Sequence, residues 1–162
     1  NYIKGFPATI GVGGATPAAS GAGISFPATA SASSDANTLD DYEEGVWSPT
    51  ISSLTNLTGT ASVSDATYTK IGRFVYLQAT IGGLSITSTS SEVGFVMTLP
   101  FSMQAAAARP VGTLFSDVGR AFGGVIDSTG SNTTEIYSMM SSSDVTSTGA
   151  TTFGLSFSYV AA

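Results

Sequence analysis

The chain has 162 residues, a formal net charge of −6 and a pI near 4.1, and only five Lys and Arg side chains. So few cations cannot neutralise a phosphate backbone, which excludes nucleic acid as a partner. The sequence contains neither cysteine nor histidine, and this excludes disulfides, thiolate or imidazole metal sites and Ser-His-Asp catalysis. Ser and Thr together number 47 and suit a solvated sheet face, whereas the long polar side chains that cover helices are scarce.

Residues 1–37 are rich in Gly, Ala and Ser and contain one short motif twice. Phe-Pro-Ala-Thr begins at Phe6 and again at Phe26. We interpret the segment as an extended arm, in which the two phenylalanines are structural anchors between intertwined copies, with a plain linker as the alternative. The first residue is Asn1 rather than Met, as expected of a processed product or a piece of a longer polypeptide.

An acidic segment at residues 38–50 follows the arm and is interpreted as a hinge. It holds four of the eleven carboxylates and the only tryptophan. We predict that Tyr42 and Trp47 are structural anchors, and that the acids form a solvated surface because their spacing differs from that of an EF-hand loop. Lys70 and Arg73 are the candidates to pair with these acids. No metal and no cofactor is expected.

Residues 46–162 alternate apolar and polar side chains in short runs separated by turn residues, which predicts strands. Gly72-Arg73 has the chemistry of a type II′ hairpin turn, and the half-buried strand 74–81 follows it. Residues 101–109 are predicted to be a loop with at most a turn or two of helix. We expect an all-β fold, an antiparallel β-sandwich of the jelly-roll kind. The other predicted strands are 47–54, 60–64, 66–71, 93–99, 111–118, 120–126, 135–140 and 153–159.

Two motifs in the chain resemble segments of bacteriophage tail-fibre and other virion-appendage proteins. The first is Leu39-Asp40-Asp41-Tyr42-Glu43-Glu44-Gly45, followed by Trp47 and Pro49, and the second is Tyr68-Thr69-Lys70-Ile71-Gly72-Arg73. The resemblance covers roughly residues 20–82, and the C-terminal half matches only in style. It implies a homo-oligomer, a trimer, that is located in the virion and attached to other virion proteins.

The function expected from this resemblance is that of the distal part of a phage tail fibre that contacts the host cell surface. A purely structural virion component, such as a capsid-mounted fibre, a decoration protein or a connector, is the alternative. A polysaccharide depolymerase fragment is a third hypothesis, and it needs two carboxylates flanking a sugar. Because acids in turns usually serve solubility or turn geometry, we expect no enzyme. The candidate carboxylates are Asp117, Asp127, Glu135 and Asp144.

Contact with a host surface glycan is expected in the C-terminal loops, whose hydroxyl and amide groups can bond sugar hydroxyls. Three aromatic residues with polar neighbours, Tyr76, Phe122 and Tyr137, are further candidates, although packing in the core or between subunits is their commoner role. No apolar run reaches the ~20 residues needed to cross a bilayer, so membrane insertion is not expected. The candidate receptor contacts are Ser131, Asn132, Thr133, Tyr137 and Ser143, and no residue is predicted to be catalytic.

Overall fold

A computed structural model of the chain describes residues 9–29, 33–35, 37–88, 92–104, 111–117, 120–128, 135–140 and 148–162. At 111, 120–128 and 135–140 only the backbone is described. The chain divides into two compact units. We call Asn1–Glu43 with Lys70–Arg73 the N-terminal unit, and Glu44–Thr69 with Phe74–Ala162 the sheet unit.

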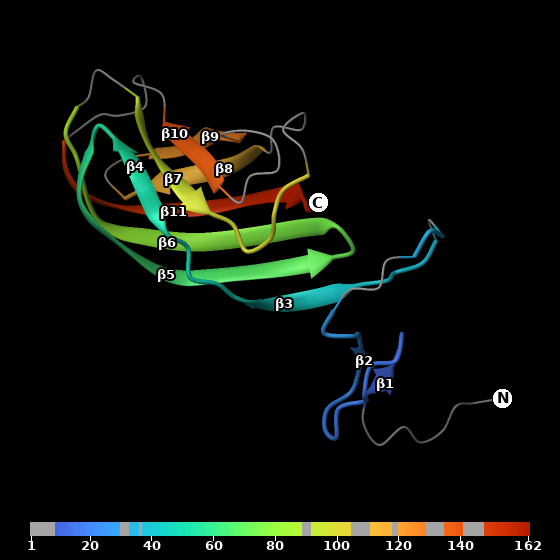
Figure 1. Ribbon diagram of the computed structural model, residues 1–162. Coiled ribbons are helices and arrows are strands. Elements are labelled where there is room, and N and C mark those ends of the chain that lie inside the picture. The colour runs from blue at the N-terminus through green and yellow to red at the C-terminus, as the bar shows by residue number, and fades with distance from the viewer. Residues whose placement is uncertain are drawn as a thin grey trace. The chain divides into compact units, whose positions relative to one another are not determined.

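The prediction of an all-β fold is confirmed, because the described residues contain strands and no helix (Figure 1). β1 and β2 form a short parallel pair. The other nine strands form one sheet in the order β3-β5-β6-β11-β8-β9-β10-β7-β4, and its described registers are antiparallel. The strands are β1 (Ile10–Gly11), β2 (Ile24–Ser25), β3 (Tyr42–Val46), β4 (Ile51–Thr55), β5 (Leu57–Ile71), β6 (Phe74–Ile86), β7 (Val93–Thr98), β8 (Val111–Ser116), β9 (Arg120–Ser128), β10 (Glu135–Met140) and β11 (Gly149–Val160).

Alternation along β6 and β11 builds the centre of the hydrophobic core, as the sequence predicted. The two strands pair along their length, with Leu77 opposite Phe157. Each large side chain that is buried in this way contributes about 1.5–3 kcal/mol of hydrophobic stabilisation. The buried residues are Val75, Leu77, Ala79 and Ile81 in β6 and Phe153, Leu155, Phe157 and Tyr159 in β11.

The nine-stranded sheet curves back over its own inner face. The rings of Phe95 in β7 and Phe153 in β11 lie 5.9 Å apart between centroids, although β8, β9 and β10 separate these strands in the sheet order. Only a strongly curved sheet brings such distant strands into side-chain contact. The core therefore lies inside the curve, and the opposite face of β6, β11 and β8 faces solvent.

Two of the predicted strands are parts of a single strand that contains a backbone irregularity. We predicted separate strands at 60–64 and 66–71, and this was wrong, because β5 is continuous from Leu57 to Ile71. Asp65 has a φ of 52° within it. Ala61 and Val63 pack against the core before this position; after it, Ala66 is buried and Tyr68 packs against the core. The inward phase therefore changes from odd to even numbers, as a one-residue bulge requires.

β5 and β6 approach each other very closely at two glycines. A Cβ atom added to Gly59 would lie 2.3 Å from the carbonyl oxygen of Gly83, and one added to Gly83 would lie 2.3 Å from that of Thr60. The φ angles of Gly59 and Gly83 are 112° and 76°. Both the space and the backbone conformation therefore require glycine at these positions.

The predicted strand at 47–54 is corrected by the structure. β3 ends at Val46 and β4 begins at Ile51, so residues 47–50 form a connection between strands at opposite ends of the sheet order. The Trp47 backbone N–H donates to the Ala66 carbonyl in β5 at 3.1 Å, and its indole Nε1–H donates to the Thr98 carbonyl in β7 at 3.2 Å. Pro49 has no N–H to continue a ladder, which favours the break.

Candidate functional site

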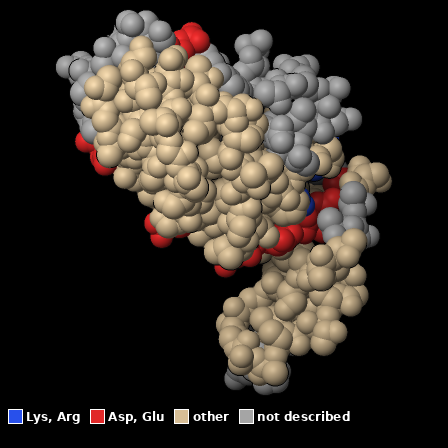
Figure 2. Space-filling view, turned by 60° about the vertical axis from the view of Figure 1, so that its left-hand side comes forward, with Lys and Arg blue, Asp and Glu red and all other residues tan. Residues whose placement is uncertain are grey.

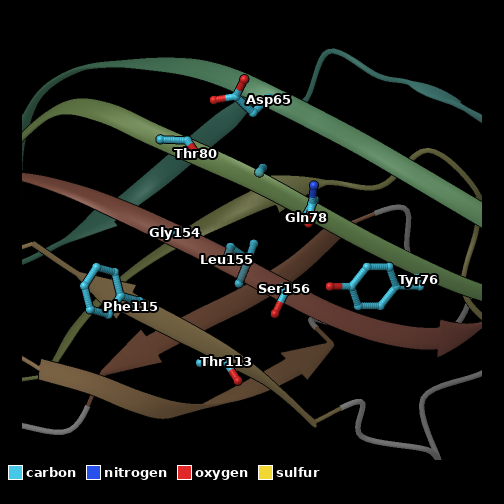
Figure 3. A pocket seen from close by; sticks show the side chains of 10 residues that line it. Asp65, Tyr76, Gln78, Thr80, Thr113, Phe115, Gly154, Leu155 and Ser156 are labelled. Atoms are coloured by element: carbon cyan, nitrogen blue, oxygen red, sulfur yellow. The ribbon is translucent and has the colours of Figure 1, made fainter.

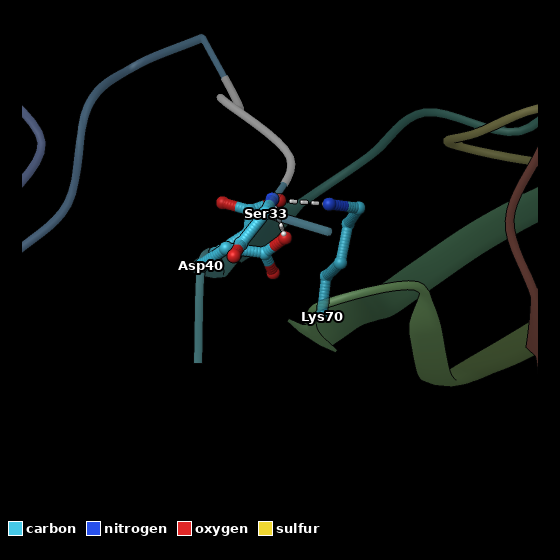
Figure 4. A network of polar contacts seen from close by, with 4 residues as sticks. Ser33, Asp40 and Lys70 are labelled. Atoms are coloured by element: carbon cyan, nitrogen blue, oxygen red, sulfur yellow. Dashed lines mark hydrogen bonds and ion pairs between the residues drawn. The ribbon is translucent and has the colours of Figure 1, made fainter. Parts of the chain in front are cut away.

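The two sequence motifs at residues 39–45 and 68–73 are joined by contacts within the N-terminal unit. Lys70 forms an ion pair with Asp41, and these side chains are only 11% and 8% exposed. The Gly72 N–H donates to the Asp41 carbonyl oxygen at 2.8 Å. Figure 4 shows the ion pair beside a second contact, in which the Ser33 N–H donates to Asp40 Oδ2 at 2.7 Å. A side chain of each motif is thus held by the other motif.

The turn in the second motif has the predicted backbone. Gly72 has a φ of 56°, whereas Arg73 has no positive φ. This is the pattern of a type II′ turn, in which the first central residue has a positive φ and the second has a negative φ. The turn fixes where β5 ends, and so it fixes the position of Lys70 two residues earlier.

Three of the four predicted anchors lie within the described residues, and Phe6 lies outside them. The rings of Phe26 and Tyr42 lie 6.4 Å apart between centroids in a tilted arrangement. Trp47 is partly buried and packs against the core of the sheet unit. Anchoring between copies of the chain stays a prediction for Phe6 and Phe26.

The predicted receptor contacts fall mostly outside the described residues. This applies to Ser131, Asn132, Thr133 and Ser143. The backbone of Tyr137 lies in β10, opposite Val96 of β7 and Asp127 of β9. The structure therefore does not test these contacts. A different candidate binding surface lies on the sheet unit.

A groove of about 370 Å³ lies on the solvent-facing side of the sheet. β11 forms its floor, and β6 and β8 border it on opposite sides (Figure 3). Strand register places Thr80, Gly154 and Phe115 in one row across the three strands. We call this feature the outer groove. The side chains that give it its character are Asp65, Tyr76, Gln78, Thr113, Phe115 and Ser156.

Two aromatic rings lie exposed on opposite sides of β11 in the outer groove. Tyr76 is 44% exposed and Phe115 is 46% exposed, whereas Phe95 and Phe153 are buried. β6 lies between β5 and β11, and β8 lies between β11 and β9. Each ring therefore projects from a strand that is paired on both sides. Strand pairing fixes the backbone that carries each ring, whereas an aromatic residue at a loop tip moves with its loop. We call these two rings the platforms.

Small and hydrogen-bonding side chains lie between the two rings. Gly154 and Ser156 lie on the floor, and Gln78 and Thr113 lie opposite Ser156 on the neighbouring strands. An amide offers donors and an acceptor, and a hydroxyl offers one donor and two acceptor lone pairs. The floor is open at Gly154, because an added Cβ would first meet a Phe115 side-chain atom at 3.8 Å.

The charge of the outer groove is low and negative. Among the described residues that line it, Asp65 is the one that is formally charged. No Lys or Arg side chain is described in the sheet unit. Figure 2 shows the same character on a larger scale, since most of the described surface in that view is neither acidic nor basic. The groove is therefore suited to neutral ligands and unsuited to anions.

Two further hollows on the sheet unit are chemically plainer. One, of about 450 Å³, lies beside Pro49, Ile51 and Val63 and contains no aromatic ring. The other, of about 390 Å³, lies beside Glu44 and Tyr68. The Tyr68 ring is already packed edge-on against Phe101, with 5.2 Å between centroids. Neither hollow offers two exposed rings with hydrogen-bonding groups between them.

Of the carboxylates that we considered for glycoside cleavage, only Asp117 has a described side chain, and it does not line the outer groove. Asp117 lies at the end of β8 and bonds to β11, and Asp144 lies outside the described residues. For Asp127 and Glu135 only the backbone is described, in β9 and β10. Among the described residues, no group of three or more potential metal ligands occurs.

Asp117 fastens the end of β8 to the start of β11. Its Oδ1 accepts the Thr152 N–H and the Thr151 hydroxyl, each at 2.9 Å, and its own N–H donates to the Thr152 carbonyl at 3.1 Å. These donors favour the ionised carboxylate and lower the pKa of Asp117 below its ordinary 3.8, with the Thr152 N–H as the largest cause. The stabilisation is therefore present above pH 3.8 and is lost as pH falls through the lowered value.

Asp117→Asn keeps an oxygen acceptor and removes the titration. We expect the parent to be more stable than this variant at pH 7, and the difference to shrink in acid below the ordinary pKa of Asp117 of 3.8. Urea unfolding of both proteins across this range measures the difference. Glu92→Gln, which removes another exposed acid of the sheet unit, controls for net charge. A difference that stays constant down to the lowest pH would contradict the assignment.

Comparisons with known protein families, with curated proteins and with solved structures found no match. Within the described part of the chain, no helix has the length and apolar character needed to span a membrane. Function is therefore inferred from the residues themselves and from their geometry.

Proposed function

We propose that the chain is part of a bacteriophage virion appendage, namely the distal part of a tail fibre that contacts the host cell surface. The observation that carries the proposal is the Asp41–Lys70 ion pair. Each residue belongs to one of the motifs that resemble appendage proteins, and 28 residues lie between them in the sequence. Their contact makes the two motifs one structural unit, as a mounting segment would require.

A buried ion pair is an uncommon means of joining two segments. Both groups lose hydration, and an apolar pair of similar volume often stabilises a fold as well or better. The chain has only five cations, and one of them is used here. These facts favour a role for the pair in fixing one orientation of the two motifs rather than in adding stability alone.

The proposal includes a homotrimer whose sheet unit is a β-sandwich. The curved sheet around one core supports the sandwich, while the jelly-roll arrangement stays a prediction of the sequence. The trimer is supported by the resemblance to appendage proteins and by the Phe-Pro repeat, since Phe26 stays only partly buried within one chain although its ring lies beside Tyr42. Sedimentation of the full chain is expected to give three times its mass of 16.3 kDa.

Immunogold electron microscopy tests the location directly. Antibodies raised against the full chain are expected to label the tail tips of virions, and Fab fragments are expected to reduce adsorption to host cells. Labelling of the capsid would replace the tail-fibre proposal with a capsid-mounted fibre. Virions without label, together with antigen only in the soluble lysate, would remove the virion proposal altogether.

A further inference from the structure

We propose that the outer groove binds a neutral oligosaccharide, with Tyr76 and Phe115 packed against the apolar faces of two different sugar rings. This assignment rests on the proposed function for its biological setting, because a host surface glycan is the ligand expected there. The residues that line the groove supply the binding chemistry itself. It places the glycan contact on a sheet face rather than in the C-terminal loops.

The separation of the two rings indicates an oligosaccharide rather than a single sugar. Tyr76 lies opposite Ser158 of β11, whereas Phe115 lies opposite Gly154, four residues away along the same strand. Two strand spacings and four residues of rise place their Cα atoms about 16 Å apart. One sugar ring cannot contact both platforms, but a chain of a few rings can.

The arrangement also keeps the cost of binding low. Both aromatic residues project from paired strands in the interior of the sheet order, so little backbone freedom remains to be lost. An aromatic face buries the C–H side of a sugar ring, while its hydroxyls need partners at the rim. Gln78, Thr113 and Ser156 form a row across the strands between the platforms and supply those partners.

The negative charge of the groove favours neutral sugars over acidic ones. Asp65 is the one charged residue in the described lining of the groove, and it can accept hydrogen bonds from hydroxyl groups. A uronic or sialic acid would bring a second negative charge to the same site, without a described cation to offset it. Neutral hexose oligomers are therefore expected to bind, and acidic oligomers are not.

The chain offers a closely matched control for this surface. Phe74 lies in the same strand as Tyr76, two residues away on the same outward face, and is 50% exposed. It does not line the groove. If the face served as a contact between copies of the chain, Phe74 would be expected to take part together with Tyr76. If the groove binds sugar, replacing Phe74 should leave sugar binding unchanged.

The test uses the full chain and an array of neutral gluco-, galacto- and manno-oligosaccharides, with oligogalacturonate and sialyllactose as acidic probes. We expect the parent to bind at least one neutral oligomer, and to bind its monosaccharide far more weakly. Tyr76→Ala and Phe115→Ala should each weaken that binding by about tenfold. Gly154→Leu should abolish it, because the new side chain fills the floor without a positive φ to disfavour it.

Several results would overturn the assignment. These are a parent that binds no neutral oligosaccharide, equal binding of the acidic probes, or a loss of binding in Phe74→Ala as large as in Tyr76→Ala. A changed sedimentation coefficient in Tyr76→Ala and Phe115→Ala would instead show that the face joins copies of the chain. Virion labelling is measured separately, so sugar binding by a chain absent from virions would overturn the proposed function and leave the groove assignment intact.

Discussion

Replacing Lys70 with Met is expected to lower the free energy of unfolding of the N-terminal unit by about 3 kcal/mol. The Asp41 carboxylate would then remain buried without the ammonium group that offsets its charge. The amide of Gly72, which is bonded to the Asp41 carbonyl, is a local probe of the opening. Its hydrogen exchange should become roughly a hundred times faster if exchange proceeds through this opening.

The double variant Asp41→Leu with Lys70→Met is the matched control for the ion pair. Replacing both partners with apolar side chains removes the uncompensated charge, and so most of the lost stability should return. A double variant as unstable as Lys70→Met alone would mean that the lysine acts through its packing and not through its charge. An unchanged Gly72 exchange rate in the single variant would contradict the ion pair itself.

Replacing Trp47 with Ala is expected to lower the free energy of unfolding of the sheet unit by about 3 kcal/mol. The indole packs against the core, and its Nε1–H donates to the Thr98 carbonyl. The backbone bond from Trp47 to Ala66 survives the substitution, so the loss is one of side-chain contacts. Urea unfolding followed by circular dichroism is the measurement, because the variant lacks the tryptophan needed for fluorescence.

Trp47→Phe separates packing from hydrogen bonding at this position. It keeps most of the ring contacts and removes the N–H donor, which is expected to cost about 1 kcal/mol. If the Ala variant is as stable as the parent, the connection at residues 47–50 does not hold β5 and β7 together. If Phe costs as much as Ala, the bond to Thr98 dominates.

The strands that could be predicted are those in which local pattern and tertiary role agree. In β6 from Val75 to Ile81 and in β11 from Thr151 to Tyr159 every second side chain is buried, so a period of two in the sequence is sufficient. β5 broke this rule because Asp65 takes a left-handed φ inside a strand, whereas a sequence of Ser and Asp reads as a turn. The inward-facing positions change from odd to even numbers at this residue, and so the sequence of one strand resembles that of two.

The outer groove could be predicted only in part. Tyr76 was a candidate glycan contact from the sequence, because it is an aromatic residue with polar neighbours. Phe115 was missed, and nothing local connects it with Tyr76. Their relation depends on the register of β11 with both β6 and β8, which places Gly154 beside Phe115. Such a register arises from tertiary packing and has no signature within one strand.

β3 and β4, the two edge strands of the sheet, affect how copies of the chain can associate when they are crowded together. β3 has five residues and contains adjacent glutamates, Glu43 and Glu44. β4 is equally short, follows Pro49, contains Ser53 with a φ of 48°, and shifts register against β7. Short length, charge and irregular backbone are the features that keep sheet edges from recruiting a strand of another molecule. Copies held close together should therefore associate through side-chain surfaces and resist aggregation by continued β-sheet.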